Sequence, residues 1–566
     1  MSRQAKDAGW APVQFAVGAG KRRSKRVMEA LPLAQPEATG GERSGVRAQH
    51  AAKGMSSTRD AAPSEATGCE RSGIHSREAS GGFGGCDGST PQLNDARSGI
   101  HSRAASGGSG GRDGAPPSSL RIGMVSLGCP KNLVDAEVML GRLQARGHQL
   151  VADAAEADVI VVNTCAFIDR AKQESIDTIL EMARLKETGK AQRLVVSGCL
   201  AQRYDAELRR EIPEIDATLG TGQVEDILRA VEGEATVAEV DSGPTWVYDH
   251  TAPRLLTTPW YLAYVKISEG CDYTCSFCII PKLRGRHRSR AVDDIEAEVR
   301  GLAQRGVKEI ILVAQDTTRY GLDLGLRDGL AILLRRLGRI NDLRWIRVMY
   351  AYPATVTDEI LDAVAAEPKV VKYVDMPLQH ASERVLKRMK RPTGRGNLLG
   401  MVERVRRRVP GVAFRTSFIV GFPGETEEDF QQLLAFVREA EFDNVGVFTF
   451  SDEEGTTSYH LPDRVDARTK ERRRRRLMAL QKRISHARNQ RRVGEQVEVL
   501  VEGAHPESDL LLSGRLASQA PEIDGSVIIS DGMAAPGAFV RVRITEAHPY
   551  DLVARMVANG RPDACY

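Results

Sequence analysis

The chain has 566 residues and a formal net charge of +4, and hydrophobic residues make up 42% of it, which is ordinary for a globular protein. The near balance of 79 basic against 75 acidic residues argues against a generic basic nucleic-acid binder. No apolar run approaches the roughly 18 residues of a membrane span, and the N-terminus lacks the apolar stretch of a secretory signal, so we expect a cytoplasmic protein.

Residues 1–119 are rich in Gly, Ser, Ala and Arg, and they contain an internal repeat. The segment RSGIHSREASGGFGGCDG (71–88) recurs with three changes at 97–114. Such a composition cannot bury enough apolar surface to offset chain entropy, so we expect a disordered leader. Its abrupt end suggests that some or all of it is an over-long translation start, with Met55 as a possible later start.

From Leu120 onward, apolar strands alternate with helical stretches. Strands are expected at 122–128, 158–164 and 193–198, and this order predicts a parallel βαβαβ sheet. Each strand leads directly to a cysteine. Because parallel strands end at one edge of a sheet, we expect these three side chains to lie together. They are Cys129, Cys165 and Cys199. The alternative is that each is a small buried residue at a strand end.

A second α/β region runs from about Trp260 to Pro462. It predicts an incomplete (β/α)6 barrel, and active sites of such barrels lie at the carboxyl ends of the strands. The expected strands are 261–268, 309–317, 344–352, 370–378, 412–420 and 444–450.

The last part of the chain divides into a basic and an acidic segment. Residues 464–492 hold 13 Lys and Arg against two acidic residues and predict a helix, with apolar Leu477, Met478, Leu480 and Ile484 available to pack one face. Such a charge run is either a solvated helix face or a contact for RNA or a ribosomal surface. Residues 494–557 predict a small antiparallel barrel of about five strands, with four basic and ten acidic residues.

A second group of cysteines, Cys271, Cys275 and Cys278, lies on one short loop after the first barrel strand. Clustered thiolates select zinc or an iron–sulfur cluster. A zinc knuckle needs a fourth ligand, for which His287 is the only nearby candidate. The alternative is a 4Fe–4S cluster whose fourth iron is open to another ligand. The other three cysteines have no expected role.

The sequence SEGCDYTCSFCIIPKLRG (268–285) resembles the radical S-adenosylmethionine (SAM) superfamily. The resemblance implies that the open iron binds SAM and that SAM cleavage produces a radical able to abstract hydrogen from an unactivated carbon. Phe277 stands where that superfamily lines the SAM adenine, although simple packing is an equal reading. Gln315, Asp316 and Arg415 lie near expected strand ends; they are plausible SAM contacts or ordinary structural polar residues.

The order of the whole chain resembles the methylthiotransferase family. The resemblance implies a second 4Fe–4S cluster on the first three cysteines and a C-terminal TRAM barrel. We expect a leader at 1–119, a cluster-binding N-terminal domain at 120–236, a radical SAM domain with its basic helix at 257–492, and the TRAM domain at 493–560.

The segment VSLGCPKNLVDAE (125–137) is similar to the branch that places a methylthio group on the β-carbon of an aspartate in ribosomal protein S12. The tRNA-modifying branches tend to have Gln–Met–Asn or Lys–Val–Asn where this chain has Pro130–Lys131–Asn132. Further matches lie at 374–392, 421–430, 450–463 and 521–527. The acidic barrel suits a basic ribosomal protein better than a tRNA backbone, so tRNA is the alternative substrate. The resemblance also implies an external electron donor.

Overall fold

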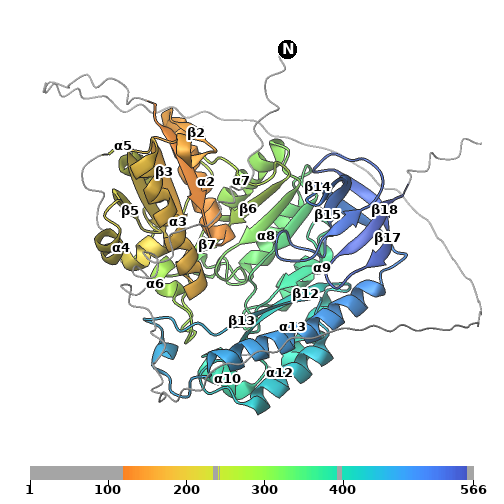
Figure 1. The fold of residues 1–566 in the computed structure, drawn as a ribbon. Helices are drawn as coiled ribbons and strands as arrows, with labels where there is room; N and C mark the ends of the chain where they lie inside the picture. Colours follow the sequence, from red (N-terminus) through yellow and green to blue (C-terminus); the bar gives the residue numbers. More distant parts are fainter. Residues whose placement is uncertain (1–118, 234–239, 241–242, 392–397, 558–566) are drawn as a thin grey trace, which may run out of the picture. The chain divides into compact units, whose positions relative to one another are not determined.

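A computed structural model of the protein describes residues 119–233, 240, 243–391 and 398–557 (Figure 1). The expected leader, except for Ser119, and the cysteines at positions 69, 86 and 565 lie outside the described residues. No helix in these ranges is both long and apolar enough to cross a membrane.

The N-terminal region forms a parallel sheet with the spatial order β2-β1-β3-β4-β5. Its strands are β1 (Arg121–Ser126), β2 (Gln149–Val151), β3 (Val159–Thr164), β4 (Arg193–Gly198) and β5 (Ala217–Leu219). Every residue of β3 is buried, as a central strand covered on both faces requires. The three predicted strands are confirmed. The edge strands β2 and β5 were not predicted, because three residues are too few for a periodic signal.

Helices cover both faces of this sheet. They are α2 (Pro130–Arg146), α3 (Asp169–Thr188), α4 (Cys199–Glu211) and α5 (Ile227–Glu232). Helices α2 and α5 pack with Val161 and Val195, whereas α3 and α4 pack with Val162 and Val196, which alternate with them along β3 and β4. The alternation therefore builds one apolar core on each face.

The central region contains six parallel strands in two sheets, ordered β10-β9-β6 and β11-β12-β13. They are β6 (Leu262–Lys266), β9 (Glu309–Val313), β10 (Trp345–Val348), β11 (Tyr373–Asp375), β12 (Ala413–Val420) and β13 (Asn444–Thr449). A single parallel bridge from Ile346 to Val370 links the two sheets. The predicted incomplete barrel is confirmed, with strands shorter than the apolar runs.

Helices pack around the outside of this barrel on a continuous apolar core. They are α7 (Val292–Gln304), α8 (Gly329–Gly338), α9 (Asp358–Ala366), α11 (Leu398–Arg408) and α12 (Glu427–Ala440), with the shorter α10 (Glu383–Arg388). The short helix α6 (Ile280–Arg284) instead packs through Leu283 on a core of the N-terminal region. A capping box between Thr426 and Asp429 fixes the start of α12.

The basic segment forms helix α13 (Ala467–Gln490). Leu477 and Leu480 are buried in the barrel core, and Met478 and Ile484 pack against it, so the predicted apolar face is confirmed. Arg473 is also buried and pairs with Glu425. Most other basic side chains of α13 lie on the exposed face.

The C-terminal region is a closed barrel with the order β14-β15-β16-β18-β17. Its strands are β14 (Gln496–His505), β15 (Ser508–Arg515), β16 (Val527–Ile529), β17 (Phe539–Ala547) and β18 (Leu552–Met556). The number of strands agrees with the prediction, but β16 and β18 pair in parallel, so the expected all-antiparallel barrel was wrong in one pairing. The reason is that β17 returns to β14 before β18 closes the barrel beside β16.

This C-terminal barrel contacts the central barrel at the amino ends of its strands. Glu309, the first residue of β9, is fully buried and pairs with both Arg347 of β10 and Arg515 of β15. The Tyr373 hydroxyl donates to Asp524 at 2.7 Å. The carboxyl ends of the central strands are thus left for the N-terminal region and the candidate site.

Candidate active site between two cysteine trios

The first trio lies at the carboxyl edge of the N-terminal sheet, as predicted. Cys129 precedes α2, Cys165 follows β3 directly, and Cys199 begins α4 immediately after β4. The loops of neighbouring strands touch. Gly128 has φ +93°, and a Cβ at this position would lie 2.7 Å from the Cys165 Cβ and 3.0 Å from its sulfur. Only glycine allows this approach, which brings Cys129 beside Cys165.

Asn132 fixes the same edge from the first turn of α2. Its Nδ2 donates to the carbonyls of Leu127 and Thr164 at 2.7 and 3.2 Å, and its own carbonyl accepts from Asn163 Nδ2 at 2.8 Å. These bonds join the loops that carry the first two cysteines. From the sequence, Asn132 was named only as part of a motif, and no structural role was predicted for it.

The second trio lies on the loop between β7 (Ser268–Glu269) and α6. The loop is closed at its base, because β7 pairs with β8 (Arg288–Ser289) and the Cys271 N–H donates to the Gly285 carbonyl at 3.0 Å. Its middle is held to the barrel by the Ser276 N–H, which donates to Met389 at 3.0 Å. The three thiols are partly buried at the mouth of the barrel.

The thiols within each trio influence one another electrostatically. Burial, together with the neighbouring thiolates of the same trio, raises the pKa of Cys165 and of Cys278 to about 12 and that of Cys271 to about 11. Burial also opposes ionisation of Cys129, but Lys131 and Arg284 outweigh it and lower the pKa of that thiol. Converging thiolates are stable only with a compensating cation, which a bound cluster supplies.

The three soft donors of each trio match the ligand set of an iron–sulfur cluster that leaves one iron open. Within the described ranges, no three His, Cys, Asp or Glu side chains converge on a single point as one metal ion requires.

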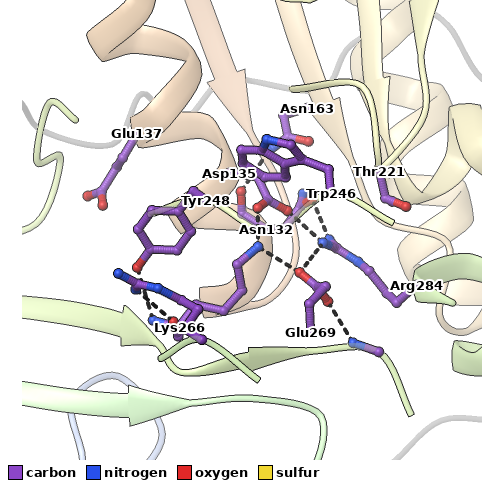
Figure 2. Close-up of polar contacts among 12 residues, drawn as sticks. Asn132, Asp135, Glu137, Asn163, Thr221, Trp246, Tyr248, Lys266, Glu269 and Arg284 are labelled. Carbon is purple, nitrogen blue, oxygen red and sulfur yellow. Dashed lines mark hydrogen bonds and ion pairs between the residues drawn. The ribbon is translucent and has the colours of Figure 1, made fainter. Parts of the chain in front are cut away.

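A buried ionic network connects the two regions that carry the trios (Figure 2). Lys266, the last residue of β6, pairs with Asp135 of α2 and with Glu269 at 2.6 Å. Arg284 of α6 binds the same two carboxylates at 2.6 and 3.2 Å. All four side chains are at most 4% exposed, so two cations balance two anions out of contact with water.

Both ends of this network reach a cysteine. Arg284 also donates to Asn132 Oδ1 at 3.1 Å and lies 3.6 Å from the Cys199 sulfur. Glu269 lies two residues before Cys271. Burial opposes ionisation of Glu269, but Lys266 and Arg284 outweigh it and lower its pKa to about 2. The network therefore holds the first trio in a fixed relation to the loop of the second.

The residues expected to contact SAM lie in different surroundings. Gln315 lies at the network, where its Nε2 donates to Glu269 at 2.6 Å and its buried Oε1 has no hydrogen-bond partner in the described part of the chain. Phe277 is partly buried against the barrel core. Asp316 accepts from the Thr318 N–H in a local turn.

Arg415 is engaged by two carboxylates. It is the third residue of the eight-residue strand β12, and it pairs with Asp375 at 2.8 Å and Asp524 at 3.5 Å, on the side that contacts the C-terminal barrel. These pairs give its guanidinium a structural role, and its contact with SAM stays a prediction.

The close approach at Gly128 gives a prediction. We expect Gly128→Ala to displace Cys129 from Cys165. If each trio holds one four-iron cluster, the variant should retain about half of the iron of the wild type. Iron and acid-labile sulfide analysis of the purified protein measures this. Gly301→Ala is the matched control, because a Cβ on this helical glycine meets nothing within 4 Å. Full iron retention in Gly128→Ala would contradict the prediction.

Three family models match consecutive parts of the chain. They are the uncharacterized protein family UPF0004 (residues 121–220), the radical SAM superfamily (265–437) and the TRAM domain (493–557). A radical SAM barrel placed between these two modules, with one cysteine trio in each of the first two, defines a radical SAM methylthiotransferase.

Curated relatives give the particular family. The chain is 52% identical over 448 residues to the ribosomal protein uS12 methylthiotransferase RimO of Solibacter usitatus, covering 78% of this chain and 96% of that protein. It is 54% identical over 440 residues to RimO of Myxococcus xanthus, covering 78% and 92%. The chain belongs to the ribosomal protein uS12 methylthiotransferase RimO family. Membership implies SAM and two 4Fe–4S clusters as cofactors.

Proposed function

We propose that this chain inserts sulfur into a C–H bond of an aspartate β-carbon in ribosomal protein S12, and that the sulfur is then methylated from SAM. The relatives described above are named ribosomal protein uS12 methylthiotransferases, which supports S12 as the substrate and a methylthio group as the product. The observation that carries the proposal is the buried network of Asp135, Lys266, Glu269 and Arg284, which holds two cysteine trios beside one barrel mouth. A reaction that combines hydrogen abstraction with sulfur delivery needs both centres at one substrate atom.

Each trio has its own role in this proposal. Cys271, Cys275 and Cys278 hold the cluster that binds SAM, and Cys129, Cys165 and Cys199 hold the auxiliary cluster. When bound, these groups supply the hydrogen abstraction and the sulfur chemistry. The chain itself orients them and excludes water. We assign Phe277 to packing against SAM and the unpartnered Oε1 of Gln315 to accepting a hydrogen bond from it.

The division of the chain follows the same roles. We assign the auxiliary cluster to residues 120–236, the SAM chemistry to 257–492 and substrate contact to the TRAM barrel at 493–560. Inclusion of α13 in the central domain is supported by the burial of Leu477 and Leu480 in the barrel core.

Charge supports S12 over tRNA as the substrate. The C-terminal barrel has four basic and ten acidic residues. The side chains of Arg515 and Asp524 are both buried, so the excess of acidic groups remains on the accessible surface. Such a surface repels a phosphate backbone and attracts a basic protein.

Helix α13 has the opposite charge and supports S12 within the small subunit as the target. Arg468, Lys482 and Arg483 are exposed and make no ion pair within the described residues. They are free to contact ribosomal RNA phosphates. We further propose that an external protein donates the electrons and that the reaction takes place in the cytoplasm, where ribosomes are found.

The test is mass spectrometry of S12 from cells with and without this protein, with tRNA nucleosides analysed alongside. We expect the aspartate of S12 to lose a mass equal to one CH₂S unit in the deletion strain, and tRNA to be unchanged. An unchanged S12 together with lost methylthio-adenosine in tRNA would show that the enzyme is a tRNA methylthiotransferase.

A further inference from the structure

Lys131 is a buried lysine that has no carboxylate partner among the described residues; its charged neighbour is the Cys129 thiol. It is the second residue of α2, directly after Pro130, and its exposed fraction is 9%. Its ammonium lies 3.5 Å from the centre of the Tyr350 ring. No carboxylate pairs with it among the residues that the structure describes. An aromatic face offsets only part of the cost of burying an ammonium group.

Other buried lysines of the chain do have carboxylate partners. Lys266 pairs with Asp135 and Glu269, and Lys172 pairs with Glu453 at 2.8 Å. The chain thus provides a carboxylate for other lysines that it buries near the trios, as the cost of an uncompensated buried charge requires. Lys131 departs from this pattern beside Cys129, at the edge where the first trio meets the barrel.

The ring below Lys131 is held by a strained backbone. Tyr350 has φ +64°, a conformation that is unfavourable for a bulky residue and persists where the surrounding structure imposes it. Its N–H donates to Asp375 at 3.0 Å and its carbonyl accepts from the Thr317 N–H at 3.2 Å. Tyr350 lies two residues beyond β10, so Lys131 is placed over the carboxyl end of a barrel strand.

We propose that Lys131 binds the side-chain carboxylate of the substrate aspartate and thereby selects a carboxylate-bearing substrate. This inference rests on the proposed function. The substrate carboxylate provides the oxygen anion that no Asp or Glu of the described residues supplies to Lys131. In aspartate the carboxylate carbon is bonded directly to the β-carbon, which is the carbon that reacts. Binding of the carboxylate at Lys131 therefore places the β-carbon beside Cys129. Asparagine has the same shape without the charge and is the natural comparison.

The test uses the enzyme loaded with both clusters, S12 with aspartate or asparagine at the modified position, and the variants Lys131→Met and Lys131→Arg. We expect the wild type to prefer the aspartate protein. Lys131→Met should lower kcat/KM for it by about 100-fold, the effect of truncating one partner of a buried charge pair, and should abolish the preference over asparagine. Lys131→Arg should retain part of the preference. Binding of fluorescently labelled S12 should show the same loss of discrimination without turnover.

Stability separates this role from a structural one. Lys131→Met removes a buried charge that has no carboxylate partner, so its Tm should equal or exceed that of the wild type, whereas loss of a structural ion pair lowers Tm. Lys190→Met, at an exposed lysine, is the control. It should change neither the preference for aspartate nor the Tm.

Three results would overturn the inference. Lys131→Met could retain the aspartate preference while the electron paramagnetic resonance spectrum of the auxiliary cluster changes, which would make Lys131 a counter-charge for that cluster. It could retain the preference while KM for SAM rises, which would assign Lys131 to the SAM carboxylate. A wild type that modifies no S12 would overturn the proposed function and this inference with it, whereas the first two results leave the proposed function intact.

Discussion

Replacing Cys271, Cys275 or Cys278 by alanine should abolish SAM cleavage, whereas replacing Cys129, Cys165 or Cys199 should stop methylthiolation and leave SAM cleavage in place. The physical reason is that the two trios belong to separately anchored elements. The second loop is closed by the β7–β8 pair and by backbone bonds to Gly285 and Met389, none of which involves the first trio.

Cys199 is the most demanding case of this prediction, because it contacts Arg284. Loss of its thiol leaves Arg284 paired with Asp135 and Glu269, so the residue that precedes the second trio keeps its partner. We therefore expect Cys199→Ala to behave like the other two variants of its trio.

The measurements are 5′-deoxyadenosine release for SAM cleavage, the mass of S12 for methylthiolation, and iron and sulfide content for each cluster. Cys69→Ala, at a cysteine with no expected role, serves as the control and should retain both activities. If Cys129→Ala still added the methylthio group to S12, the division of labour between the trios would be wrong. Zinc without acid-labile sulfide in the purified protein would exclude both clusters.

Sequence alone could locate the six cysteines because the information is local. Each of the first three follows an apolar run, and parallel strands must end at one edge. The loop spacing of the second trio is also a local pattern. The edge strands of the N-terminal sheet and the parallel pairing of β16 with β18 escaped because three-residue strands carry no periodic signal and topology is not a local property.

The polar part of the site could not be predicted for a different reason. Lys266 and Asp135 are 131 residues apart, and Arg284 and Asp135 are 149 apart, so no spacing rule connects them. Arg415 shows the same limit. Its partner Asp524 comes from the C-terminal barrel, so this ion pair cannot be read from the sequence around Arg415. Lys131 entered the sequence argument only as part of a motif, because burial without a carboxylate partner is visible only in the fold.

Lys266→Met should lower the free energy of unfolding by about 3–5 kcal/mol, the usual effect of removing one member of a buried ionic network. The Lys266 side chain is 0% exposed and lies between two carboxylates, so its loss leaves Asp135 and Glu269 with Arg284 alone. Lys387→Met, on the exposed face of α10, should change stability by less than about 0.5 kcal/mol. Thermal unfolding at pH 7 measures both.

The pH dependence of this loss identifies its cause. In the wild type the pKa of Glu269 is held at about 2, below the ordinary value of 4.5, so its contribution to stability is fully present above pH 4.5 and is lost as the pH falls toward 2. Without Lys266 the pKa of Glu269 should rise, and the difference in Tm between wild type and Lys266→Met should narrow over the same interval. The double variant Lys266→Met/Glu269→Gln should recover part of the loss at pH 7, because one anion then faces one cation. A Tm difference that stayed constant from pH 7 to pH 3 would show that lost packing, and not the uncompensated carboxylates, destabilises the variant.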